Sequence, residues 1–190
     1  MTRLHDLYYG PRSQHLARSQ ASDSAVQEVV IHAPATRALR THLRCTGRWW
    51  GGPIFGSLQQ GTVGIEYITP GTVPGSRTAL DTPLAMDADY VLGWADALSA
   101  THQSQLDWQG MWVMAPNAEM QDALDQLRWV YQARQQGLLT EERALLFVGW
   151  QEGRLSGVAY IQRDEPEAIP VAFENGGITP LLPRTPRASE

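Results

Sequence analysis

Residues 108–119 constrain the fold of this chain more than any other stretch, and they are Trp-Gln-Gly-Met-Trp-Val-Met-Ala-Pro-Asn-Ala-Glu. The apolar run has the length of a buried strand, and the Ala-Pro-Asn turn after it leads into an amphipathic pattern typical of a helix. In an α/β protein, ligands are usually held at the carboxyl end of such a strand. We therefore expect a site at this junction, although Val113, Met114 and Ala115 carry no metal-binding or acid/base group.

The other periodic segments extend this strand and helix into one domain. Strands are predicted at 26–31, 53–58, 62–69, 109–114, 144–150 and 155–162, and helices at 34–47, 87–101 and 118–136. Short turns at 59–61 and 151–154 predict that two pairs of strands form hairpins. The element order predicts an α/β or α+β sandwich, in which a single mixed β-sheet is flanked by about three helices.

Capping residues predict where two of these helices begin. Asp87 is suited to cap the helix at 87–101, and Asn117 is suited to cap the helix at 118–136. The buried stripe of this last helix is predicted to consist of Met120, Ala123, Leu124, Leu127 and Tyr131.

Composition divides the chain into three regions. Residues 1–24 are rich in Arg, Ser, Gln and His without periodicity, and we expect a flexible arm. Residues 25–163 form the predicted domain, which includes a long loop at 70–86. Residues 164–190 are acidic and then proline-rich, which predicts a disordered tail.

Charge and cysteine content restrict the partners and the compartment. The net charge of −5 argues against nucleic acid as the main partner, because duplex binding needs a basic surface. The fifteen basic residues are all arginine and are scattered along the sequence, which indicates a compositional bias of the genome. A single cysteine, Cys45, excludes an intramolecular disulfide framework. With no apolar run long enough to cross a membrane and no secretory signal, we expect a cytoplasmic protein that does not bind membranes.

Two segments resemble a known family. Residues 49–56 are Trp-Trp-Gly-Gly-Pro-Ile-Phe-Gly, and residues 110–116 are Gly-Met-Trp-Val-Met-Ala-Pro. The first resembles the Glu-x-Gly-Gly-x-x-x-Gly segment of JAB/MPN (JAMM) domains, and the second resembles their Gly-x-Trp-His-Ser-His-Pro segment. The resemblance covers about residues 26–162 and implies the JAB/MPN (cytidine-deaminase-like) architecture.

In that family, two His and one Asp hold a zinc ion that activates water, and a Glu acts as general base in peptide or isopeptide cleavage. Carried over by position, the Glu falls on Trp49, and the two His fall on Val113 and Ala115. The family's Ser-x-x-Asp pair falls on Ala123 and Gln126. The resemblance therefore implies a degenerate site without zinc or any other cofactor, since these apolar side chains offer zinc no ligand. Its pocket would be lined by Trp49, Trp50, Trp112, Val113, Met114 and Ala115.

Three carboxylates near the same junction provide an alternative. Glu119, Asp122 and Asp125 are spaced three residues apart on the early part of the predicted helix. They could bind a hard cation in a relocated hydrolase site. Acidic residues in the first turns of a helix also complement its dipole without any ligand, which is the simpler interpretation.

The leading hypothesis is a catalytically inactive JAB/MPN-like domain that binds a protein or peptide, or a second copy of itself. Either the former cleft binds the partner, or these side chains fill it as core and binding happens elsewhere or not at all. The alternative is a metal-dependent peptidase or isopeptidase that uses the relocated carboxylates. A single-strand nucleic-acid module is the third reading, and the acidic net charge disfavours it.

Overall fold

Strand β4 (Asp107–Met114) is an inner strand of one mixed sheet of eight strands, in the order β7-β6-β5-β4-β2-β3-β1-β8. The computed structural model describes residues 3–9, 26–44, 47–73 and 82–174. The other strands are β1 (Glu28–Ile31), β2 (Trp50–Gln59), β3 (Thr62–Ile68), β5 (Ala144–Gln151), β6 (Arg154–Gln162), β7 (Pro166–Ile169) and β8 (Val171–Phe173). β4 pairs antiparallel with β2 and parallel with β5, so the sheet is mixed at its centre.

The two edge strands of the sheet follow one another in the sequence. β7 pairs with β6 at one edge, β8 pairs with β1 at the other, and only Pro170 separates β7 from β8. A Cβ on Gly157 of β6 would lie 3.5 Å from the ring of Phe173 in β8, so the two edges approach each other. The sheet is therefore strongly curled.

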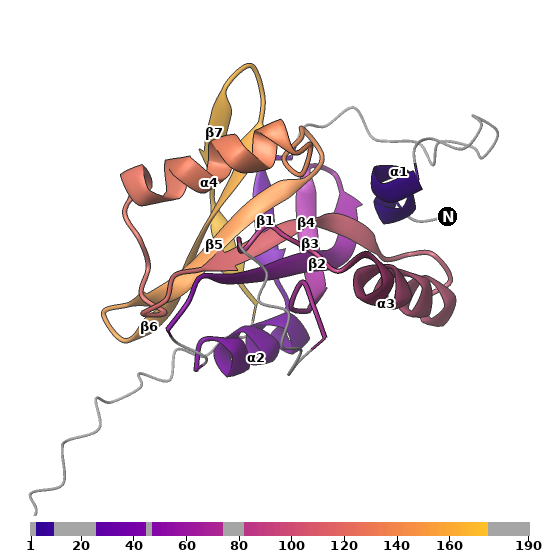
Figure 1. Cartoon of the computed structure of the whole chain (residues 1–190), viewed down its shortest axis with the longest axis horizontal. Coiled ribbons are helices and arrows are strands. Elements are labelled where there is room, and N and C mark those ends of the chain that lie inside the picture. Colours follow the sequence, from indigo (N-terminus) through magenta and orange to yellow (C-terminus); the bar gives the residue numbers. More distant parts are fainter. Residues whose placement is uncertain (1–2, 10–25, 45–46, 74–81, 175–190) are drawn as a thin grey trace, which may run out of the picture.

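Helices cover both faces of this sheet (Figure 1). They are α1 (Arg3–Tyr9), α2 (Ala33–His42), α3 (Ala88–Thr101) and α4 (Ala123–Gln135). Because side chains alternate along a strand, each face carries its own core. Trp112 and Met114 belong to the core that includes Leu39 of α2, whereas Val113 belongs to the core that includes Trp129 of α4. We call these two sides the α2 face and the α4 face.

Most of the predicted elements are present. The six predicted strands correspond to β1 to β6, and both predicted hairpins form, β2 with β3 and β5 with β6. The Asp87 carboxylate caps α3 as expected, because it accepts a hydrogen bond of 3.1 Å from the Tyr90 N–H. The coarse prediction of one mixed sheet flanked by helices is confirmed. In the part of the chain that the structure describes, no helix is long and apolar enough to cross a membrane.

Both predicted terminal regions are wrong where the structure describes them. Part of the predicted arm is the helix α1, whose Leu4 is fully buried in the core of the α4 face. Part of the predicted tail forms β7 and β8, because Pro166 stands at the first position of an edge strand, where proline is tolerated. Residues 10–24 and 175–190 lie outside the described residues.

The start of α4 also differs from the prediction. The amide oxygen of Asn117 accepts the Glu119 N–H at 3.1 Å and forms a local turn instead of a helix cap. The next residues bridge to β5, where the Met120 N–H donates to the Trp150 carbonyl at 3.0 Å. The helix begins only at Asp122, whose carboxylate accepts the Asp125 N–H at 3.0 Å.

The buried stripe of α4 is accordingly not the predicted one. Gln126, Trp129, Val130 and Ala133 face the sheet. Leu124 is 79% exposed and Tyr131 is 49% exposed, although both were predicted to be buried. The predicted stripe began at Met120, which precedes the helix, and so its phase was wrong.

Gly51 and Gly52 allow other backbone segments to cross β2. A Cβ on Gly52 would lie 2.1 Å from the Thr69 carbonyl oxygen, and one on Gly51 would lie 2.3 Å from the Pro83 carbonyl oxygen. Both contacts are far shorter than a carbon atom permits, and the obstructing atoms are backbone. The segment after β3 is then tied to β2 by the Gly71 N–H, which donates to the Gly51 carbonyl at 2.9 Å.

We expect Gly52→Ala to lower the free energy of unfolding by about 3 kcal/mol, because the added methyl must displace backbone. Gly93→Ala is the matched control: a Cβ on Gly93, inside α3, meets nothing within 4 Å. That substitution should raise the free energy of unfolding by about 0.5–1 kcal/mol through helix propensity. Urea titration of both variants measures the difference, and equal stability would contradict the close crossing.

Candidate functional site

The structure brings together the two segments that carry the predicted site. β2 and β4 run antiparallel, with Trp50 opposite Met114 and Gly51 opposite Val113. Just beyond this pairing, the Gly47 N–H donates to the Pro116 carbonyl at 2.7 Å. Trp49 and Ala115 therefore occupy the facing stretch between these contacts, at the carboxyl end of β4.

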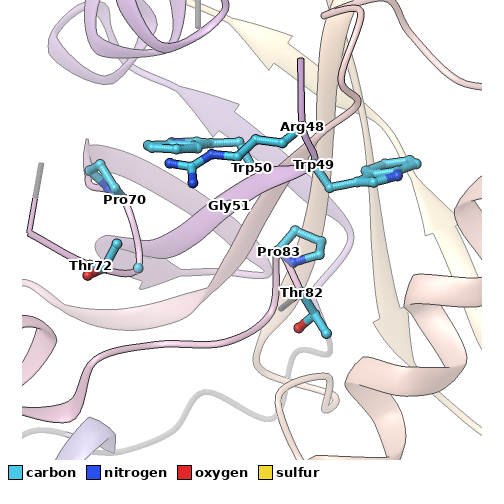
Figure 2. Close-up of a pocket in the computed structure, with 9 residues that line it drawn as sticks. Arg48, Trp49, Trp50, Gly51, Pro70, Thr72, Thr82 and Pro83 are labelled. Atoms are coloured by element: carbon cyan, nitrogen blue, oxygen red, sulfur yellow. The ribbon is translucent and has the colours of Figure 1, made fainter. Parts of the chain in front are cut away.

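The sheet nevertheless divides the six predicted pocket residues between its two faces. Trp50, Trp112 and Met114 lie on the α2 face, whereas Trp49 and Val113 lie on the α4 face. Figure 2 shows the indole rings of Trp49 and Trp50 on opposite sides of β2. Trp112, Val113, Met114 and Ala115 are all at most 2% exposed. These residues are core and do not line one shared pocket.

On the α2 face, Trp112 is held by two contacts. Its indole N–H donates to the Thr69 carbonyl at 2.9 Å, and its ring stacks on His42, the last residue of α2, with ring centroids 5.3 Å apart. Burial lowers the pKa of the His42 imidazole, because an apolar surrounding disfavours its charged form.

At the edge of the same face, Trp50 packs beneath an arginine. The Arg48 guanidinium lies 4.0 Å from the centre of the Trp50 ring, a cation–π contact. The Nε1 atom of Trp50 is buried and has no hydrogen-bond partner among the described residues.

On the α4 face, aromatic and amide groups fill the space between sheet and helix. The Trp49 ring meets the edge of Trp129 of α4, with centroids 5.2 Å apart. Gln126, 3% exposed, uses both ends of its amide: it accepts the Tyr160 hydroxyl at 2.9 Å and donates to the Gln121 carbonyl at 2.7 Å. Burial raises the pKa of Tyr160, which keeps its hydroxyl protonated as the donor.

Four of the positions that the resemblance associates with catalysis are found in this layer. Trp49 and Val113 belong to the core of the α4 face, and the strand alternation puts Ala115 on the side of Val113. Gln126 reaches the layer from α4. Ala123, at the start of α4, is exposed. The one polar group of this set that lies in the layer, the Gln126 amide, already has two hydrogen-bond partners.

The alternative acidic cluster does not form a site on α4 as predicted. Glu119 precedes the helix, where the Asn117 side-chain amide donates to its carboxylate at 3.2 Å. Asp122 caps the helix, and Asp125 lies in its exposed first turn. Among the described residues, no group of three or more His, Cys, Asp or Glu side chains is placed to hold a metal ion.

One hollow opens at the surface beside β2. It is lined by Arg48, Trp49, Trp50, Gly51, Pro70, Gly71, Thr72, Thr82 and Pro83 (Figure 2). The hollow has an empty volume of about 320 Å³, which includes space open to solvent. The sequence indicated the two tryptophans, but not the contribution of residues 70–72 and 82–83 from either end of the predicted loop.

Comparisons with known proteins bear on the fold alone. No family model matches the chain, and no curated protein matches it. The chain is similar to the solution structure of protein DSY2949 from Desulfitobacterium hafniense, with a TM-score of 0.51 and 10% sequence identity. The match covers 77% of this chain and 92% of that chain. It supports the arrangement of sheet and helices and assigns no activity.

We expect Tyr160→Phe to lower the free energy of unfolding by about 1–3 kcal/mol, since it leaves the buried Gln126 oxygen without a donor. Tyr131→Phe is the control: Tyr131 is 49% exposed, and its loss should change stability by less than about 0.5 kcal/mol. Chemical unfolding of both variants measures this. A Tyr160→Phe protein as stable as the control would show that the hydrogen bond is dispensable.

The depressed pKa of His42 predicts a pH effect. The folded state favours the neutral imidazole, so its contribution is fully present above the unfolded pKa of about 6.5 and is lost as the pH falls through the folded value. The free energy of unfolding of the wild type, measured relative to that of His42→Gln, should therefore fall as the pH is lowered from about 8 to about 5. Denaturant titrations at several pH values test this, and a constant difference would contradict burial of the ring.

Proposed function

We propose that the chain is a catalytically inactive JAB/MPN-like domain that binds a protein or peptide partner. The observation that carries the proposal is the largely apolar layer beneath α4. It holds Trp49, Val113 and Gln126, with Ala115 on the same side of its strand. These are the positions where the resemblance expects the general base and the zinc ligands.

The chemistry of these side chains supports the loss of catalysis. A catalytic zinc needs three protein ligands and an open position for water. Indole, isopropyl and methyl groups donate no lone pair to zinc, and the Gln126 amide is engaged at both ends. The Trp49–Trp129 contact occupies the space beside β2 on this face.

The glycines that match the family pattern have a structural role in this fold that does not depend on catalysis. Gly51 and Gly52 are required by the backbone that crosses β2, whatever the neighbouring side chains do. The glycines that the fold needs are present, whereas the positions of the metal ligands hold apolar residues. This combination supports a domain whose role depends on its fold and not on catalysis. Binding is the function that such a domain can still perform.

The partner must contact the outer surface of the domain. Residues 112–115 are at most 2% exposed, so they can contact nothing outside the chain. Burial thus favours the second version of the hypothesis, in which the former cleft is filled as core, and we place the proposed binding elsewhere on the surface.

Rebuilding the ligand set tests the proposed history of the site. We expect the variant Trp49→Glu/Val113→His/Ala115→His/Gln126→Asp to bind one zinc ion per chain, because all four positions lie on the same side of the β2–β4 pair. Zinc affinity is measured by competition with a chromophoric chelator, and circular dichroism verifies that the variant folds. The triple variant that keeps Trp49 serves if the quadruple variant unfolds.

The matched control places Met114→His in place of Ala115→His, which puts the two imidazoles on opposite faces of β4. This control has the same composition of ligands and should bind zinc far more weakly. Equal affinity of the two folded variants, or no zinc binding by either one, would contradict the assignment of these positions.

A further inference from the structure

Residues 29–65 contain no Asp or Glu, although the whole chain carries a net charge of −5. The same stretch contains Arg37, Arg40, Arg44 and Arg48. In the sequence, these arginines are explained by the compositional bias towards arginine. In the fold, however, they lie on and just after α2.

Two of them lie on α2 itself, and Arg44 lies two residues beyond the last residue of the helix, His42. At 100° per residue, Arg37 and Arg40 are about 60° apart around the helix axis. Ala35, Thr36 and Leu39 are buried on the opposite side, against the sheet. Arg37 and Arg44 are exposed, and Arg40 is partly exposed. α2 lies on the side of the sheet opposite α4 (Figure 1).

Arg48 lies beyond the end of this helix, next to the surface hollow. It is exposed, and its guanidinium lies along the Trp50 ring (Figure 2). We call Arg37, Arg40, Arg44 and Arg48 together the α2 arginine strip.

Within the described part of the chain, no residue of the strip has a carboxylate partner. Elsewhere such partners exist: Arg134 pairs with Glu165 at 3.3 Å and Arg163 with Glu167 at 3.0 Å. At the start of α2, Glu66 and Glu174 are both engaged by His32. Among the described residues, therefore, no carboxylate neutralises the guanidinium groups of the strip.

Helix electrostatics explain only part of this pattern. Cations near the C-terminus of a helix interact favourably with its dipole, which accounts for Arg40 and Arg44. Arg37 lies nearer the other end of α2, and Arg48 lies outside the helix. Like charges spaced three or four residues apart also repel one another. The strip therefore costs the free domain some stability, which an anionic partner would recover.

We propose that the α2 arginine strip binds an acidic segment of a partner polypeptide. Guanidinium groups form bidentate hydrogen bonds with carboxylates, and a row of them matches a run of Asp or Glu. This inference rests on the proposed binding function and names its surface and the chemistry of its partner.

Nucleic acid fits the strip less well. The net charge of −5 repels a polyanion at long range, and Arg48 covers a face of the Trp50 ring on which a base would otherwise stack. A short acidic peptide can bind the strip locally, within a Debye length of about 8–10 Å.

Fluorescence anisotropy with a labelled oligoglutamate peptide tests the proposal. The variant Arg37→Gln/Arg40→Gln/Arg44→Gln should bind the peptide about tenfold more weakly than the wild type, and wild-type binding should weaken as salt rises. The control Arg128→Gln/Arg134→Gln/Arg154→Gln removes the same charge from exposed positions elsewhere and should bind as the wild type does.

Three outcomes would overturn the proposal: no peptide binding by the wild type, equal weakening in both triple variants, or tighter binding of a single-stranded RNA of equal charge that the strip variant abolishes. The last outcome would assign the strip to nucleic acid. None of these outcomes depends on the zinc affinity of the rebuilt site, so failure of the strip and failure of the degenerate-site assignment are distinguishable.

Discussion

The pairing of β2 with β4 is the constraint on which the rest of the structure depends. It is possible only because Gly51 and Gly52 leave room for the backbone after β3 and at Pro83. In the segment that crosses there, the Gly71 N–H donates a hydrogen bond to the Gly51 carbonyl, and the Thr69 carbonyl accepts one from the buried indole N–H of Trp112. One pair of glycines thus fixes the centre of the sheet, the approach of Thr69 and Pro83 to β2, and the position of the fully buried Trp112 on the α2 face.

The same pairing determines what the candidate site can do. Alternation along β2 sends Trp49 to one face and Trp50 to the other, and alternation along β4 does the same for Val113 and Met114. The side that would carry catalytic groups is filled by an aromatic pair, and such pairs contribute about 0.5–1.5 kcal/mol beyond their buried area. The side chains at these positions stabilise the fold and offer a metal no ligand, and this is the physical basis for proposing a binding domain.

The sequence predicted the parts of the fold that have a strong local signal. The alternation in β3, the Gly-containing turn between β5 and β6, and the Asp87 cap of α3 each follow from a few adjacent residues. The start of α4 could not be predicted this way, because Asn117 is as suitable for a turn as for a cap and the bridge from residue 119 to Trp150 in β5 decides between them. β7 and β8 were missed because strands of four and three residues around a proline are specified by their neighbours β6 and β1. For the site, the sequence indicated that two segments should meet, but it could not show that the tryptophans separate to opposite faces or that four arginines lie on and just after α2.

The central claim is that the largely apolar layer beneath α4 binds no metal. Elemental analysis of the unmodified chain tests it directly, first as purified without chelators and again after dialysis against excess zinc. We expect zinc far below one ion per chain in both samples. One tightly held zinc per chain, lost when Gln126 is replaced by Ala, would contradict it.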